Sequence, residues 1–343
     1  MKNVLLLGVA VLLGTAAYGQ NNYTMVNIVN NTQDPFLINP WGMSRVVNPN
    51  AKENEWWVSD NGTGLSTLYY ANKTGSASLA KLVVTIPTAS GAGTGSPTGT
   101  AFFNNNFAFS TLDGTISNWN ANTPGTGGKA CASCHITTAT VMVNHSSQGA
   151  SYQGLTVAKN ATSGAQTYYA ANANGGIEAY DATSFAPVTL SPGAFTDPKV
   201  PAGYTPAGIQ AVGSRIYVAY NLNSGGGTGF VTVYDTTGKL LLRLQNGSFN
   251  QPWGIASAPA NFGQFSKMIL VGNTGSGWIG AYSPSNGKFQ GFLQSGGSTI
   301  TIPGLWGIEF GNGNVESGPT NVLYFNGGGA NQTTGVFGSI TAN

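Results

Sequence analysis

The sequence predicts an all-β chain whose strands are grouped into six similar units. A motif that ends in glycine recurs six times, at separations of 57, 55, 54, 46 and 53 residues, and short segments of alternating apolar and polar residues follow the copies. Alternation with a period of two is typical of half-buried strands. Because one small sheet cannot bury both of its faces alone, repeats near this length indicate blades stacked in a ring. We therefore expect a six-bladed β-propeller formed by residues 20–343.

Each repeat should begin with an inner strand that carries the recurring glycine. The six copies are Asn39-Pro-Trp-Gly42, Ser96-Pro-Thr-Gly99, Ser151-Tyr-Gln-Gly154, Thr205-Pro-Ala-Gly208, Gln251-Pro-Trp-Gly254 and Gly304-Leu-Trp-Gly307. A second strand that ends in a polar turn follows, for example Trp56–Asp60 or Met268–Gly272. Third strands with an aromatic residue near the end are expected at Ser66–Tyr70, Thr115–Trp119, Ile177–Asp181, Phe230–Asp235 and Trp278–Tyr282.

A fourth, outer strand is expected in five of the repeats. The segments are Lys81–Thr85, Thr138–Asn144, Pro187–Leu190, Leu240–Leu244 and Phe289–Leu293. The sixth repeat reaches the end of the sequence before such a segment, and Tyr23–Val29 precedes the first inner strand. We expect this N-terminal strand to complete the sixth blade, because closing the ring removes an exposed sheet edge.

The first 19 residues have the layout of a cleavable signal peptide. Lys2 precedes an apolar run, Val4–Leu13, and then the small-residue stretch Gly14–Gly19. That apolar run is about ten residues, which is shorter than the roughly 20 needed to span a bilayer. We therefore expect cleavage near Gly19, a periplasmic or extracellular mature chain, and no membrane span.

The composition argues against a nucleic-acid partner. Charged residues make up 7% of the chain and the formal net charge is +2, with the basic residues scattered. A nucleic-acid-binding protein usually carries a clustered basic surface. The hydrophobic content of 41% still provides enough material for a core.

The repeats resemble known families. The Pro-x-Gly inner strand, polar turn and aromatic-ended third strand resemble the NHL-type repeat. Asn39-Pro-Trp-Gly42, Trp57–Tyr69, Asp113–Trp119 and Val336–Thr341 are similar to an exported family of conserved hypothetical propellers, in which many members carry a PEP-CTERM sorting tail. This resemblance covers nearly the whole mature chain and implies the propeller fold, but it implies no activity.

One motif departs from that family pattern and contains residues that can bind a cofactor or a metal ion. A lengthened segment after Trp119 contains Cys131-Ala-Ser-Cys134-His135, with both cysteines of the chain and one of its two histidines. In an exported protein, Cys-x-x-Cys-His is the signature of covalent c-type haem attachment, in which His135 would be the proximal iron ligand. A Cys131–Cys134 disulfide is the alternative in an oxidising compartment, and another metal is a third. A structural zinc site is disfavoured because four ligands are needed.

The expected blade order places this segment between the third and fourth strands of the second blade, at the rim. If Thr138–Asn144 is extended, His145 lies roughly 33 Å from His135, and Met142 about 23 Å, at about 3.3 Å per residue. Neither should reach the same iron. The sixth iron position would then be open, filled by a loop group, or supplied by His145 of a neighbouring chain.

A hydrolase or lactonase site at the central tunnel is a weaker candidate. Polar residues that could hold calcium there are Asn39, Asp60, Asn61, Asn172, Asn221, Asn273, Glu309 and Asn326. Asx residues at strand ends commonly serve turns, and one carboxylate on an inner strand is not an acid–base pair. Trp41, Trp253 and Trp306 could line a ligand site, although packing between blades is the favoured explanation.

Two functions remain from the sequence, and neither is an enzyme. The first is an exported monohaem electron carrier with a protein redox partner. The second is a non-enzymatic propeller that binds a protein or a surface polymer, with a Cys131–Cys134 disulfide.

Overall fold

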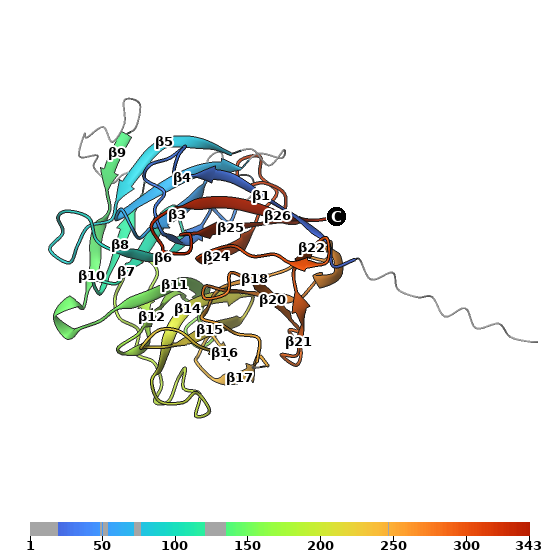
Figure 1. Cartoon of the computed structure of the whole chain (residues 1–343). Helices are drawn as coiled ribbons and strands as arrows, with labels where there is room; N and C mark the ends of the chain where they lie inside the picture. The colour runs from blue at the N-terminus through green and yellow to red at the C-terminus, as the bar shows by residue number, and fades with distance from the viewer. Residues whose placement is uncertain (1–19, 49, 51–53, 72–76, 121–134, 246) are drawn as a thin grey trace, which may run out of the picture.

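Six small sheets surround a common axis in the computed structural model, which describes residues 20–48, 50, 54–71, 77–120, 135–245 and 247–343 (Figure 1). Blade 1 contains β2 (Pro40–Ser44), β3 (Trp56–Asp60), β4 (Leu65–Ala71), β5 (Ala77–Thr85) and β9 (His135–Thr138). Blade 2 contains β6 (Pro97–Phe103), β7 (Asn106–Thr111), β8 (Thr115–Trp119) and β10 (Thr140–Asn144). Blade 3 contains β11 (Tyr152–Lys159), β12 (Gln166–Asn172) and β13 (Gly176–Asp181).

The other three blades follow in chain order. Blade 4 contains β14 (Tyr204–Val212), β15 (Arg215–Leu222), β16 (Gly229–Asp235) and β17 (Leu240–Arg243). Blade 5 contains β18 (Pro252–Ser257), β19 (Ile269–Asn273), β20 (Ile279–Tyr282) and β21 (Phe289–Phe292). Blade 6 contains β24 (Leu305–Phe310), β25 (Val322–Gly327), β26 (Val336–Ala342) and β1 (Tyr23–Asn30). Outside the blades lie the hairpin β22 (Gln294–Ser295) and β23 (Ser298–Thr299), and the 3₁₀ turns η1 (Ser146–Gln148) and η2 (Gly263–Phe265).

The six recurring glycines are explained by close approach of the inner strands. Each inner strand contacts the next around the axis, and β24 contacts β2 to complete the circle. A Cβ atom added at Gly42, Gly99, Gly154, Gly208, Gly254 or Gly307 would lie within 3.0 Å of a backbone atom of the following inner strand. Rigid backbone cannot yield as the end of a side chain can, so only glycine fits at these positions. The repeat therefore records the packing of six blades against one another, and the predicted six-bladed β-propeller is confirmed.

The N-terminal strand closes the ring as expected. β1 pairs antiparallel with β26, from Tyr23 opposite Ala342 to Asn30 opposite Val336. Tyr23 is fully buried, and its hydroxyl donates a hydrogen bond to the carbonyl of Phe262, 3.1 Å away. Residues from both ends of the chain thus complete one sheet.

One predicted outer strand is wrong, and a second is confirmed with a later start, as β10 (Thr140–Asn144). In blade 3 the segment Pro187–Leu190 forms only an isolated bridge between Tyr180 and Pro187. Proline has no N–H, so Pro187 and Pro192 limit the ladder that this segment can form. In blade 2 the expected strand Thr138–Asn144 is divided at Ala139, and the part before it belongs to blade 1.

Apolar side chains fill the spaces between neighbouring blades. Tyr217, Val231 and Val233 of blade 4, for example, pack with Ile255 and Val271 of blade 5, and all five are buried. Within the described ranges, no helix has the length and apolar character needed to cross a membrane.

Candidate functional sites

The predicted haem motif falls largely outside the described residues. Cys131 and Cys134 are both in that part, while the backbone of His135 begins β9. β9 pairs in parallel with β5, with His135 opposite Leu82 and Thr138 opposite Thr85. The lengthened segment therefore leads from β8 of blade 2 to the outer edge of blade 1, and not directly to the fourth strand of blade 2. Figure 1 shows β9 at the rim, as expected, above β10.

The chain after His135 is joined to both blade 1 and blade 2. The Trp119 indole nitrogen donates a hydrogen bond to Thr137 Oγ1 at 2.7 Å, and the Ala139 amide donates to the Thr85 carbonyl at 2.9 Å. Thr137 and Ala139 are buried. An outer strand has a row of unpaired backbone groups, so β5 offers a ready edge for β9. The break at Ala139 removes the single extended strand on which the expected separation of His135 and His145 depended.

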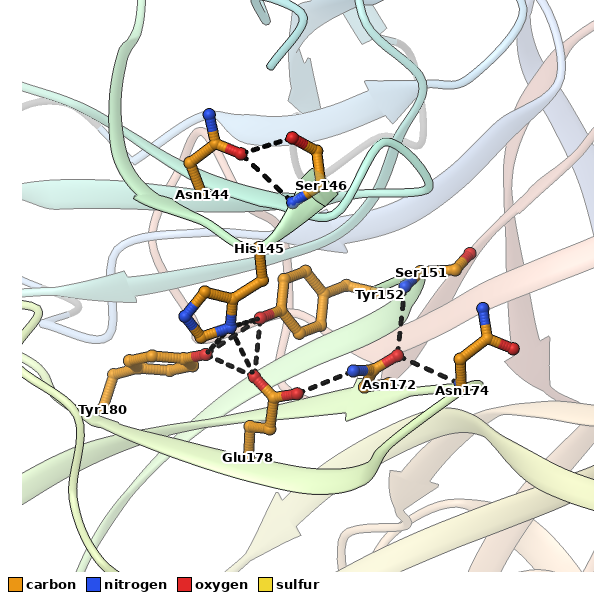
Figure 2. Close-up of polar contacts among 9 residues, drawn as sticks. All are labelled: Asn144, His145, Ser146, Ser151, Tyr152, Asn172, Asn174, Glu178 and Tyr180. Atoms are coloured by element: carbon orange, nitrogen blue, oxygen red, sulfur yellow. Dashed lines mark hydrogen bonds and ion pairs between the residues drawn. The ribbon is translucent and has the colours of Figure 1, made fainter. Parts of the chain in front are cut away.

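A cluster of polar side chains surrounds His145, which directly follows β10 (Figure 2). Its Nδ1 lies 3.2 Å from Glu178 Oε2 and 3.0 Å from the Tyr152 hydroxyl. The Tyr152 hydroxyl donates to the same carboxylate oxygen at 2.6 Å, and the Tyr180 hydroxyl also donates to it. Asn172 Nδ2 donates to the other oxygen at 2.6 Å. These contacts join blade 2 to blade 3.

Hydrogen bonding controls the charge of this cluster. Burial raises the pKa of Glu178, but the hydrogen bonds from Tyr152, Tyr180, Asn172 and His145 outweigh burial and leave that pKa below its ordinary value. Burial, reinforced by the neighbouring carboxylate, raises the pKa of both tyrosines. Glu178 is therefore an anion at neutral pH that accepts hydrogen bonds from neutral phenols.

Sequence reasoning treated His145 as a lone residue and missed this cluster. Asn172 was considered only for a tunnel cation site, and the other members were visible only as parts of expected strands, Tyr152 on an inner strand and Glu178 and Tyr180 on a third strand. Their two-residue spacing places Glu178 and Tyr180 on the same face of β13. That spacing was the available signal, but the partner blade could not be identified from it.

Three tryptophans close one end of the central axis. Trp41 stacks on Trp306 with ring centroids 3.7 Å apart, and Trp253 meets both edge-on. Each of the three is only 8% exposed. Further along the axis, the space between the inner strands has a volume of about 20 Å³. That is room for about one water molecule. The three tryptophans pack against one another, and the space between the inner strands is too small for a substrate.

The residues predicted for a tunnel cation site serve the scaffold. Asn326 Oδ1 accepts from the Gly307 amide at 2.6 Å, and Asn273 Oδ1 accepts from the Asn250 amide at 2.9 Å. Asn39 accepts from the Trp306 indole, Asn61 donates to the Pro97 carbonyl, and Asn172 supports Glu178. Asp60 is buried and accepts from Thr67, while Asn221 lines a depression of about 230 Å³ on the axial face. Asn39 Nδ2 donates to Asn61 Oδ1 at 3.4 Å, but no set of acidic side chains gathers around them among the described residues.

Glu309 pairs with a cation rather than with a second acid. Its Oε1 lies 3.5 Å from Arg45 NH2, and that guanidinium also donates to the Phe310 carbonyl at 2.6 Å. Burial raises the pKa of Glu309, and Arg45 only partly opposes this effect. Among the described residues, no group of three or more His, Cys, Asp and Glu side chains is arranged to hold a metal ion.

An open pocket lies between the outer parts of blades 4 and 5, and we call it the blade 4–5 groove. Its aromatic lining is Phe249, Trp278, Phe289 and Phe292, and its polar lining is Gln245, Ser248, Asn250 and Ser276, with Gly247 at its edge. Its volume is about 640 Å³, against about 230 Å³ for the depression on the axial face. Figure 1 shows β17, which precedes Gln245, close to β21, which carries the two phenylalanines. No local sequence pattern indicated the groove beyond the expected strand that began at Trp278.

Comparisons with known proteins identify relatives but no family. No family model matches the chain, so the NHL-type resemblance stays a prediction. Uncharacterized protein R648 of Acanthamoeba polyphaga mimivirus is 31% identical over 124 residues, 33% of this chain and 31% of that protein. Uncharacterized protein R640 of the same virus is 30% identical over 184 residues, 49% of this chain and 33% of that protein. The chain thus spans about a third of the length of these relatives.

Solved structures with a similar chain path include propellers. The WD40 β-propeller domain of Doa1 has a TM-score of 0.49 and 11% identity, and the match covers 94% of this chain and 97% of that one. The nidogen/laminin complex has a TM-score of 0.48 and 12% identity, and the match covers 77% of this chain and 82% of that one.

Proposed function

We propose that this chain is an exported, non-catalytic propeller that binds its ligand in the blade 4–5 groove. The observation that carries this proposal is the contrast between the axis and the groove. Buried indoles pack at the axis, which leaves about 20 Å³ between the inner strands and a depression of about 230 Å³ on the axial face. The groove has about 640 Å³ and an aromatic lining that includes the solvent-exposed Trp278. Ligand sites are usually concave, largely apolar and equipped with a few polar groups, and this description fits the groove.

In this proposal the cysteines have a structural role. Cys131 and Cys134 would form a local disulfide after export, since the periplasm and the cell exterior are oxidising. The adjoining strand β9 is already attached to β5. A disulfide there would close a short loop next to this strand.

Binding without turnover is the test of the proposed function. The mature chain, residues 20–343, would be assayed for retention on immobilised polysaccharides and for hydrolysis of chromogenic esters and lactones. The proposal predicts retention on at least one polymer and no hydrolysis above the buffer rate. Hydrolysis that disappears in Glu309→Gln would contradict it, because Glu309 is the acid that the inner strand β24 supplies.

The His145 cluster favours a second candidate, an exported monohaem electron carrier. The Nδ1 of His145 faces Glu178, and Figure 2 shows the other ring nitrogen pointing away from the carboxylate. Histidines that bind metal ions commonly make such a contact to a carboxylate through the other nitrogen. Cys131, Cys134 and His135 would hold haem c, and His145 of a neighbouring chain would serve as the sixth ligand. When bound, that group would supply one-electron chemistry to a redox partner protein.

Mass spectrometry separates the two candidates. The chain would be exported from cells that contain a haem-attachment system and analysed intact. A covalent haem adds a large fixed mass and a pyridine haemochrome spectrum, whereas a disulfide lowers the mass by two hydrogens. A haem-free, disulfide-bonded product would end the carrier candidate, and a haem-loaded product would refute the disulfide.

A further inference from the structure

We infer that the blade 4–5 groove takes a sugar ring of a neutral polysaccharide, an assignment of ligand class that rests on the proposed binding function. Three properties of the groove lead to this class: a row of aromatic rings, amide and hydroxyl groups beside that row, and the lack of ionisable side chains in the described lining. The aromatic rings favour a ligand with a flat apolar face, and the amide and hydroxyl groups favour a ligand that carries hydroxyl groups. The lack of ionisable side chains favours a neutral ligand.

The aromatic rings form a continuous row from the core to the surface. Phe249 stacks on Tyr282 with centroids 5.1 Å apart, and Tyr282 contacts Phe289 at 5.4 Å. Phe289 contacts Phe292 at 4.9 Å, and Phe292 meets Trp278 at 5.1 Å. The buried end fixes the outer rings, so a ligand would order few side chains when it binds.

Trp278 is the exposed end of this row and has a fixed orientation. Its side chain is 38% exposed, although its indole nitrogen already donates to Thr301 Oγ1 at 3.1 Å. The Trp278 carbonyl accepts hydrogen bonds from the backbone amide and side-chain amide of Asn273. With both polar groups engaged, the face of the indole ring is what remains for a ligand. Sugar rings present C–H groups on one face, and these pack on an aromatic face through apolar contact.

The polar lining suits the hydroxyl groups at the edge of a sugar ring. Gln245 Oε1 accepts from the Phe289 amide at 3.1 Å, which fixes the carboxamide and leaves its NH₂ group as a donor. The Asn250 backbone is fixed by Asn273 at 2.9 Å. An amide can both donate and accept, as a sugar hydroxyl does, so each can exchange hydrogen bonds with the same ligand.

The charge of the groove argues against ionic ligands. None of the described lining residues is acidic or basic. A cationic sugar would find aromatic faces but no carboxylate to pair with in the described lining. An acidic sugar would need a cation, and the closest one in sequence, Lys288, lies outside the lining. A neutral polysaccharide requires neither.

The size and openness of the groove favour a polymer. Its volume of about 640 Å³ lies within the roughly 300–1,000 Å³ of ligand pockets, so it can hold more than one ring. Gln245, Gly247 and Trp278 at its margin are exposed to solvent. A chain can therefore continue past the site in either direction.

The test uses defined hexasaccharides and the mature chain. Isothermal titration would compare cellohexaose, xylohexaose and maltohexaose with anionic oligogalacturonate and cationic chitosan hexamer. We expect at least one neutral hexasaccharide to bind and both charged ones to bind more weakly. Trp278→Ala should weaken that binding about tenfold or more, while Trp278→Phe should retain part of it. Leu241→Ala is the matched control, because Leu241 is 45% exposed on β17 and does not line the groove.

The outcomes separate this inference from the proposed function. If only a charged hexamer binds, or if a neutral one binds equally to Trp278→Ala, the neutral-sugar assignment is overturned while a binding propeller remains. If the chain binds no immobilised polymer and hydrolyses an ester or lactone, both fail. Circular dichroism and thermal unfolding of each variant would show that the ring is intact.

Discussion

The axis and the blade 4–5 groove both contain tryptophan, but they use it differently. Trp41, Trp253 and Trp306 are each 8% exposed and pack against one another where the inner strands converge. Trp278 is 38% exposed and contacts Phe292 at the outer edge of blade 5. Burial converts an indole into scaffold, whereas exposure of a fixed indole leaves a surface for a ligand. The fold would place a ligand site at the central axis, but in this chain packed tryptophan side chains fill that position.

The largest expected effect is a loss of stability at the axis. Trp306→Ala should lower the free energy of unfolding by about 3–5 kcal/mol, because it leaves a cavity and deprives Asn39 of its indole donor. Trp278→Ala should lower it by no more than about 1 kcal/mol. Urea unfolding followed by circular dichroism measures both. Equal losses of unfolding free energy in the two variants would show that the axial tryptophans are no more important for packing than Trp278.

The glycines around the axis should also be sensitive to substitution. Gly208→Ala places a Cβ against the Trp253 carbonyl of the next blade, so we expect a loss of about 3 kcal/mol. Gly226→Ala is the control, since a Cβ there meets nothing within 4 Å and only the positive φ of 74° opposes it. That control should lose about 1 kcal/mol. A Gly208→Ala variant as stable as the control would refute the packing account of the repeat.

A smaller effect is expected at the His145 cluster, which lies away from both tryptophan regions. The pKa of Glu178 is lower in the folded chain than its ordinary value of 4.5. Its charged form therefore stabilises the fold above that value, and the contribution is lost as the pH falls through the folded-state pKa. Glu178→Gln should cost about 1 kcal/mol at pH 7, and this difference should shrink as the pH falls below the ordinary glutamate value. Urea unfolding at several pH values checks it, and a difference that grows in acid would contradict the assigned direction.

The smallest effect is optical. Trp278 is more exposed than the three axial tryptophans, so acrylamide should quench it more than them. Trp278→Phe should reduce the quenching of total tryptophan fluorescence without changing the unfolding midpoint by more than a few degrees. Trp253→Phe should leave the quenching almost unchanged. The opposite order would mean that the axial end is open to solvent.

Much of the ring could be predicted from the sequence, because the patterns that indicate its strands are local and recur in each blade. The six glycines indicated the number of blades, and alternation located most inner, second and third strands. Closure by Tyr23–Val29 followed from the need to cover an edge. Outer strands were harder, since they carry few buried residues. The choice of β5 as the partner of β9 depends on a contact between blades that no local pattern encodes.

The candidate sites were less predictable for the same reason. The His145 cluster joins residues 145, 152, 172, 178 and 180 from two blades, and the groove joins residues 245 and 247–250 with residues 276, 278, 289 and 292. Each segment alone has the appearance of an ordinary strand or turn. Cys131, Cys134 and His135 were visible because their spacing is itself the signal. Whether they hold haem or form a disulfide stays a prediction that the intact mass decides.

The indole N–H signals in a two-dimensional ¹H–¹⁵N spectrum test the central claim most directly, since the chain has seven tryptophans and each gives one signal. The Trp278 signal would be assigned from Trp278→Phe, and the hexasaccharide that binds most tightly would be titrated in. The account predicts that the Trp278 signal shifts in proportion to occupancy while those of Trp41, Trp253 and Trp306 stay in place. A shift of the axial signals with Trp278 unchanged would place the ligand at the axis and contradict the account.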